Sequence, residues 1–129
     1  MVQSNVQVIQ DFYADLGRGE LSAAFTHLDP EFELHQAESL PYGGVYRGYE
    51  SVTKFFEVFG RTWANFQSTD VEYLEAGDYV IVRSRIRGQA KQSGNELEMP
   101  MIQVFQMRDG KAITAHPFYW DTARLLQVL

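Results

Sequence analysis

With 129 residues, the chain has the length of one ordinary domain, so an enzyme with separate cofactor and substrate domains is excluded. Its 45% hydrophobic and 22% charged residues are typical of a globular protein rather than of a disordered chain. The formal charge of -6 disfavours nucleic acid and anionic membranes as partners, and the absence of cysteine excludes disulfides, a thiol nucleophile and thiolate metal sites.

The N-terminal residues do not show the pattern of a secretory signal. Its first ten residues, MVQSNVQVIQ, lack a basic start followed by an apolar core, and no apolar run in the chain approaches the roughly 18 residues of a membrane helix. We therefore expect a cytoplasmic, soluble protein.

Two helices are predicted at the start of the chain. Apolar residues recur at helical spacing between Val6 and Leu16, and Ser4 with Gln7 has the spacing of a capping box. Gly17 and Gly19 end this helix. A short second helix over residues 21–28, closed by Pro30, completes a helical hairpin.

The middle of the chain predicts a strand, a loop and a third helix. Residues 31–36 alternate between apolar and polar side chains, and the following ESLPYGGVYRG is rich in turn formers. The third helix carries a broad apolar stripe, which requires a wide surface to pack against. The stripe comprises Val52, Phe55, Phe56, Phe59 and Trp63.

From residue 65 onward the hydrophobic period changes to two, which predicts an antiparallel meander. The expected strands cover residues 66–75, 78–89, 97–107 and 112–119. Asp109 and Gly110 supply the positive φ of a tight hairpin turn. A last helical turn follows Asp121.

Helices followed by strands form the α+β pattern, in which a curved antiparallel sheet curls around helices on one face. The element order, the loop LPYGGVYRG and the ending FYWDTARLLQVL resemble the NTF2-like superfamily, and within it the SnoaL-like and ketosteroid-isomerase-like members. The resemblance covers nearly the whole of residues 1–129. It implies a single domain with three N-terminal helices on a conical barrel, whose lumen holds a small, mostly apolar molecule, and a homodimer formed through the outer face of the sheet.

His35 lies near the end of the first strand, where the resemblance implies a catalytic base, although the ketosteroid isomerase has an aspartate there. An imidazole in an apolar funnel can take a proton from a carbon beside a carbonyl. The alternative is a hydrogen-bonded core histidine. Glu38 either orients this imidazole or is solvated.

Asp121 matches an aspartate that some SnoaL-like chains use as an acid, and the neighbouring aromatic residues Phe118 and Trp120 are expected to exclude water from it. The competing interpretation is a helix N-cap, which needs no ligand. His116 shares a strand face with Phe118 and Trp120. That face lines the cone together with His35 or faces a partner subunit or solvent, and we favour the second case.

Several aromatic side chains are predicted to bind substrate. Tyr42, Tyr46 and Tyr49 belong to the loop that covers the mouth of the funnel, as hydrogen-bond donors or as a plain lid. Phe56, Phe59 and Trp63 serve as core and as pocket wall together. The full set of expected substrate-binding residues is Glu38, Tyr42, Tyr46, Phe56, Phe59, Trp63, His116, Phe118 and Trp120.

No cofactor and no metal are expected. His35 and His116 with nearby carboxylates have suitable chemistry for iron or zinc, but no H-x-H or H-E-x-x-H spacing supports such a site.

The strand faces predict a partner on the outside of the sheet. Arg83, Arg85 and Arg87 share one face and are expected to point outward. The next strand is apolar on both faces, which favours a convex side covered by a second subunit.

Three functions are therefore compatible with the sequence. The first is a SnoaL-like enzyme of the isomerase or cyclase type, in which His35 is the general base and Asp121 the general acid on a carbonyl-containing substrate. The second is a non-catalytic module that binds a small apolar metabolite. The third is a scaffold whose cone is filled by its own side chains.

Overall fold

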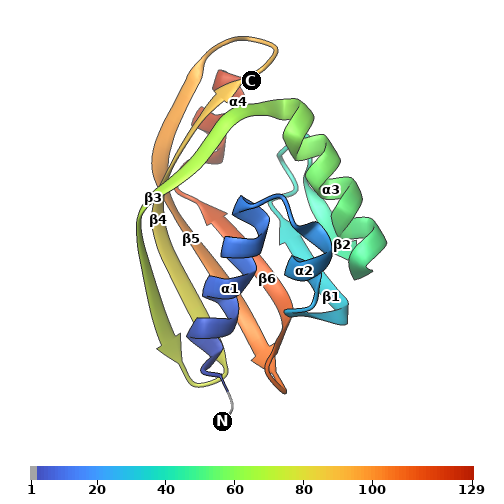
Figure 1. Ribbon diagram of the computed structural model, residues 1–129. Coiled ribbons are helices and arrows are strands. Elements are labelled where there is room, and N and C mark those ends of the chain that lie inside the picture. The colour runs from blue at the N-terminus through green and yellow to red at the C-terminus, as the bar shows by residue number, and fades with distance from the viewer. Residues whose placement is uncertain (1–2) are drawn as a thin grey trace.

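The computed structural model describes residues 3–129 as a strongly curved six-stranded sheet with helices against its concave face (Figure 1). The elements in chain order are α1 (Asn5–Gly17), α2 (Leu21–Phe25), β1 (Leu28–Gln36), β2 (Gly44–Arg47), α3 (Gly48–Thr62), β3 (Trp63–Ala76), β4 (Tyr79–Ala90), β5 (Glu96–Arg108), β6 (Lys111–Tyr119) and α4 (Thr122–Val128). The strand order is β2-β1-β6-β5-β4-β3. Only β1 and β6 pair in parallel; every other neighbouring pair among the described strands is antiparallel.

α1 begins where the sequence predicts it. The hydroxyl of Ser4 accepts a hydrogen bond from the backbone N–H of Gln7 at 3.1 Å, as in a capping box. The Gln7 side chain donates from its Nε2 to Asp11 Oδ1 at 2.8 Å. The helix buries Val8 and Ile9 against the sheet and ends at Gly17.

The second helix is shorter than predicted. α2 ends at Phe25, and β1 has already begun at Leu28, so Pro30 lies within a strand instead of closing a helix. Proline is tolerated there because it falls where the pairing between β1 and β6 shifts register, so no regular ladder bond is lost. His27 is half-buried after α2, and its Nε2 lies 3.0 Å from Asp15 Oδ2 in α1.

The loop after β1 contains a strand that the sequence analysis did not predict. β2 pairs antiparallel with β1, so that Val45 lies opposite His35 and Tyr46 opposite Leu34. Four residues are too few for a period of two to stand out. At the other end of α3, Trp63 opens β3 instead of completing the helical stripe.

The antiparallel meander from β3 to β6 is confirmed, and its strands extend up to three residues beyond the predicted ends. Asp109 and Gly110 both have positive φ, as the predicted hairpin turn requires. Two register shifts interrupt the pairing of β3 with β4, near residues 65 and 70, and such bulges increase the bend of a sheet.

The curvature divides the strands into a concave and a convex face. Concave side chains pack with α1 and α3 into one buried cluster that includes Phe12, Phe32, Val52, Val82 and Phe105. The α+β fold predicted from the sequence is confirmed, but the sheet is unclosed, since β2 and β3 remain as edges. No helix within residues 3–129 is long and apolar enough to cross a membrane.

Candidate functional site

A mostly apolar cavity of about 160 Å³ lies between the concave face and the helices. We call it the deep chamber. It is similar in volume to the roughly 150 Å³ apolar cavity that binds benzene in an engineered protein. Its lining residues are Phe12, Leu16, Phe32, Leu34, Gln36, Val52, Phe55, Phe56, Phe59, Phe66, Met101, Gln103, Phe105, Ala115, Pro117 and Tyr119.

The deep chamber adjoins a wider hollow of about 580 Å³, here called the mouth, which lies between α1, α3 and the strands β3 and β4. Leu16, Phe56, Phe59, Phe66 and Gln103 line both. The two hollows are therefore adjacent, and the side chains that they share are mainly aromatic.

The α3 stripe forms one wall of both hollows. Phe59 contacts Phe55 at a ring-centroid distance of 5.5 Å and Phe66 of β3 at 4.8 Å, the latter edge to face. Such pairs stabilise the packing beyond the apolar area that they bury. Phe56 and Phe59 therefore pack against the hydrophobic core and also line the cavity, as the sequence predicts.

Polar atoms reach the deep chamber from Gln36, Gln103 and Tyr119. Gln36 follows Phe32 and Leu34 in the inward phase of β1, and it is 7% exposed. The Tyr119 hydroxyl donates a 3.1 Å hydrogen bond to Gln36 Oε1. These neutral groups suit a polar atom on an otherwise apolar ligand.

The polar groups of the deep chamber carry no charge near neutral pH. Burial raises the pKa of Tyr119 far above its ordinary value, and the adjacent phenol of Tyr42 raises it further. Burial also raises the pKa of Tyr13 at the mouth. Among the described residues that line either hollow, none is an aspartate, glutamate, histidine, lysine or arginine.

His35 lies on the convex face, so its predicted position in the lumen is wrong. The alternation of β1 turns Leu34 and Gln36 inward and His35 outward. His35 stacks on His116 at 4.3 Å between ring centroids, and its Nε2 lies 3.0 Å from Glu33 Oε1. The sequence analysis allowed this outward position for His116 and favoured it.

The two histidines border a shallow depression of about 290 Å³ on the convex face. Glu38, Val45 and Phe118 also line it, and Glu38 is exposed. Burial and the charge of His35 lower the pKa of His116, while Glu33 partly offsets them. Neither imidazole faces the cone.

Asp121 is also outside the cone, contrary to the expectation that it shares the lumen with His35. Its side chain is exposed and accepts a 3.1 Å hydrogen bond from the backbone N–H of Arg124, which is the N-cap of α4. Phe118 and Trp120 are 57% and 77% exposed, so they do not shield it from water. They line no part of the deep chamber.

Three aromatic residues expected at the site support the deep chamber without lining it. Tyr42 is 1% exposed, and its hydroxyl accepts a 3.1 Å hydrogen bond from Trp63 Nε1. Tyr46 donates from its hydroxyl to the backbone carbonyl of Tyr42 at 3.0 Å, and its ring packs on Phe55. Together they fix the loop after β1 against α3.

Sequence analysis missed the polar lining residues. Gln103 stands in an otherwise apolar run of alternate residues on β5, and Gln36 continues the inward phase of Leu34. A glutamine in such a phase is the signal that could have identified them. Within residues 3–129, no group of three or more His, Asp or Glu side chains is arranged to hold a metal ion.

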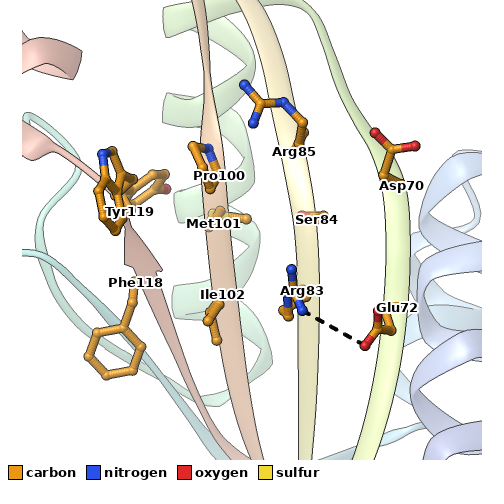
Figure 2. A pocket seen from close by; sticks show the side chains of 11 residues that line it. Asp70, Glu72, Arg83, Ser84, Arg85, Pro100, Met101, Ile102, Phe118 and Tyr119 are labelled. Atoms are coloured by element: carbon orange, nitrogen blue, oxygen red, sulfur yellow. Dashed lines mark ion pairs between the residues drawn. The ribbon is translucent and has the colours of Figure 1, made fainter.

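Another hollow, open and of about 540 Å³, lies on the convex side of β3 to β6 (Figure 2). Arg83 points toward Glu72, with 4.0 Å between Nη1 and Oε1. Ile102 lies next to Arg83 on β5, and Phe118 lies next to Ile102 on β6. The outward direction predicted for Arg83, Arg85 and Arg87 is confirmed, since all are exposed.

Comparison with known proteins agrees with this architecture. The family model for the SnoaL-like domain matches residues 9–116. No curated protein matches the sequence.

Solved structures share the fold along almost the full chain. An NTF2-like protein from Burkholderia thailandensis is 24% identical, with 98% of each chain covered and a TM-score of 0.89. TerC, co-crystallised with polyporic acid, is 20% identical, with 96% of each chain covered and a TM-score of 0.86. A candidate polyketide cyclase from Pseudomonas putida is 16% identical, with 98% of this chain and 99% of that chain covered and a TM-score of 0.80.

Proposed function

Because this chain belongs to the SnoaL-like domain family, we propose that it binds a small, mostly apolar molecule in the deep chamber and holds one polar atom of that molecule at Gln36 and Tyr119. The observation that carries the proposal is the composition of the lining. Aromatic and aliphatic walls surround a few neutral polar groups, which is the usual make-up of a small-molecule pocket.

The expected ligand has one or two rings. Transfer of its apolar surface from water to the phenylalanine-lined walls supplies the driving force, and the polar atom fixes its orientation. A ligand of this size buries little area, so we expect a dissociation constant on the order of 0.1 to 1 mM for a simple ring probe.

The test uses indane, an apolar bicyclic hydrocarbon, and protein labelled with ¹³C at the methionine methyl groups. Met101 lines the deep chamber, whereas the buried Met107 on the same strand does not and serves as an internal reference. The Met101 methyl resonance is expected to shift and saturate with indane.

A matched pair of variants locates the binding. Ala115→Leu adds atoms to the wall of the deep chamber, while Thr114→Leu makes a similar change at the neighbouring position of β6, which does not line it. Indane binding is expected to be lost in the first variant and kept in the second. Saturable binding that survives Ala115→Leu, or no binding to the wild-type protein, would contradict the proposal.

A second candidate function is proton transfer on a carbonyl compound, as in an isomerase or cyclase. The similarity to a candidate polyketide cyclase favours it, and a phenol and an amide in an apolar chamber can stabilise a developing oxyanion. The reaction also needs a base, and neither His35 nor Asp121 supplies one to the described lining. Binding is therefore the function proposed first.

Exchange of the C2 hydrogens of 1-indanone in D₂O separates the two candidates. A catalyst would speed exchange in proportion to protein concentration, and Tyr119→Phe would slow it. Tyr79→Phe is the matched control, because Tyr79 is an exposed tyrosine outside the deep chamber. Exchange at the buffer rate would leave binding as the sole function of the chamber.

A further inference from the structure

Gln103 is a polar side chain at the junction of the deep chamber and the mouth. It lies on β5 in the same phase as Met101 and Phe105, which are buried on the concave face. It lines both the deep chamber and the mouth. It lines neither the shallow depression beside His35 nor the open convex hollow of Figure 2. Its strand phase and the hollows that it lines therefore agree that its side chain faces the concave side.

The side chains around Gln103 on this face cannot pair with its amide. Val82 of β4 lies opposite it on one side, and Pro117 of β6 lies opposite it on the other. Together with Met101 and Phe105 along β5, these are the closest positions on the same face of the sheet. All four are buried apolar residues. The sheet therefore offers the amide no side-chain nitrogen or oxygen.

The amide of Gln103 has no hydrogen-bond partner within residues 3–129. In this part of the chain no fully buried side-chain nitrogen or oxygen lacks a partner. Because Gln103 is half-buried, its unpaired Oε1 and Nε2 must both remain accessible, and the hollows that it lines give the access. Gln36 differs, since its Oε1 already accepts from the Tyr119 hydroxyl.

A ligand that fills the deep chamber excludes water from the Gln103 amide. A donor or acceptor that becomes buried without a partner weakens binding about tenfold or more. A well-matched ligand therefore supplies an acceptor for Nε2 and a donor for Oε1. The described residues that line the two hollows include no charged side chain to pair with an ionic group. An uncharged donor and acceptor are therefore favoured over a carboxylate or an ammonium group.

We infer that Gln103 is a specificity-determining residue that selects ligands carrying a carboxamide or lactam group, with an apolar ring in the deep chamber and the amide group at its junction with the mouth. Two primary amides can form a pair of hydrogen bonds, in which each N–H donates to the carbonyl oxygen of the other. The inference rests on the proposed function, which supplies the binding site for the ring.

Benzamide, acetophenone and cumene test this inference. Each has one ring and a substituent of similar shape. The carboxamide has a donor and an acceptor, the acetyl group has only an acceptor, and the isopropyl group has neither. Dissociation constants are measured from the Met101 methyl resonance in the wild-type protein and in Gln103→Leu. The ratio of the two constants for each probe cancels the differences in hydrophobicity between the probes.

Gln103→Leu is expected to weaken benzamide binding about tenfold, acetophenone binding about threefold and cumene binding not at all. These losses correspond to two, one and no hydrogen bonds. Gln106→Leu is the matched control, because Gln106 is half-buried on β5 outside both hollows, and it should leave all three constants unchanged. Gln36→Leu should weaken benzamide binding less than Gln103→Leu does.

Amide proton resonances give a second readout that uses the wild-type protein. A hydrogen bond from Nε2 is expected to move one of the two Gln103 side-chain amide protons downfield when benzamide binds, and cumene should cause no such shift. ¹⁵N-labelled benzamide reports the reciprocal bond, because one of its own amide protons is expected to move downfield. Absence of both shifts in the bound state would overturn the inference.

The affinity measurements also separate the inference from the proposed function. Equal weakening of benzamide and cumene by Gln103→Leu would indicate loss of packing alone, and equal weakening of benzamide and acetophenone would mean that only the acceptor is recognised. A larger loss for benzamide in Gln36→Leu would assign its recognition to the other amide. Each of these results would overturn the inference while cumene binding upheld the proposed function. Failure of all three probes would overturn the inference, and failure of indane as well would overturn the proposed function.

Discussion

The concave and convex faces of the sheet are built from alternate residues of the same strands, yet they differ in chemistry. On β6, Ala115 and Tyr119 line the deep chamber, while His116 and Phe118 between them lie on the convex side. Every ionisable side chain that drew attention in the sequence lies outside the chamber, and the polar groups inside it are neutral.

The cost of burial explains this difference. A neutral amide or hydroxyl can enter an apolar interior when it is hydrogen-bonded, whereas a charged group loses several kcal/mol unless it is paired. Gln36 and Tyr119 satisfy each other inside, whereas Arg83 and Glu72 pair at the surface. Titratable residues are thus a poor guide to the proposed ligand site of this protein, and hydrogen-bonded neutral ones are a better guide.

The largest contrast between the faces is expected for loss of an apolar side chain. Phe105 is 1% exposed and packs against Phe12 at 6.2 Å between centroids, whereas Ile102 on the same strand is 39% exposed. Phe105→Ala should lower the free energy of unfolding by about 3 to 5 kcal/mol, and Ile102→Ala by about 1 kcal/mol or less. Urea unfolding measures both, and equal losses would contradict the division into faces.

The second largest difference in stability is expected when a carboxylate is introduced inside and outside the chamber. Gln36→Glu places an acid in the chamber, and Gln106→Glu places one at a half-buried position outside it. Burial raises the pKa of the inner acid above that of the unfolded chain, so stability falls as the pH rises through the two values. At pH 8 we expect a loss of about 2 to 4 kcal/mol for Gln36→Glu, largely recovered at pH 5.

The control variant Gln106→Glu should lose less than about 1 kcal/mol at either pH. Urea unfolding at pH 5 and pH 8 provides the comparison. A penalty for Gln36→Glu that did not depend on pH would mean that the acid reaches solvent.

A second copy of the chain bound to the convex face would bury part of that face. The difference in exposure between the concave and convex faces would then be smaller. The face carries exposed Phe118, and its charges pair locally, as in Arg85 with Glu98 at 3.5 Å, so it presents no strong field of one sign. We predict a dimer in which Phe118→Glu weakens association by about 2 kcal/mol or more, as expected for a central aromatic contact.

Sedimentation velocity over a concentration series measures this association. Leu126→Glu on α4 serves as the control for an added charge at another exposed apolar position. A wild-type protein that remains monomeric at high concentration would contradict self-association through the convex face.

The smallest expected effect concerns acid stability. The pKa of His116 is lowered in the folded protein, chiefly by burial and then by His35, so the unfolded chain takes up the proton first as the pH falls. Stability attributable to His116 is therefore complete above the ordinary histidine pKa of about 6.5 and declines below it. His116→Asn should flatten the fall in unfolding free energy between pH 6.5 and 5, and an unchanged slope would show that the shift is negligible.

Much of the fold followed from local pattern. The cap at Ser4, the stripe containing Phe56 and Phe59, and the strand alternation from β3 to β6 depend on neighbours within a few residues, and all are confirmed. The helix-cap interpretation of Asp121 agrees with the hydrogen bond that its side chain accepts from the backbone N–H of Arg124. The short β2 was missed because four residues are too few for a period of two to stand out.

The sequence by itself determined which residues share a face, because a strand turns successive side chains to opposite sides whatever surrounds it. Only the tertiary structure decided which face became concave on β5, where both faces are rather apolar. It also decided that Tyr119 would reach Gln36, 83 positions away. Such contacts depend on how distant strands register and curve together, and that is a property of the assembled sheet rather than of any one segment.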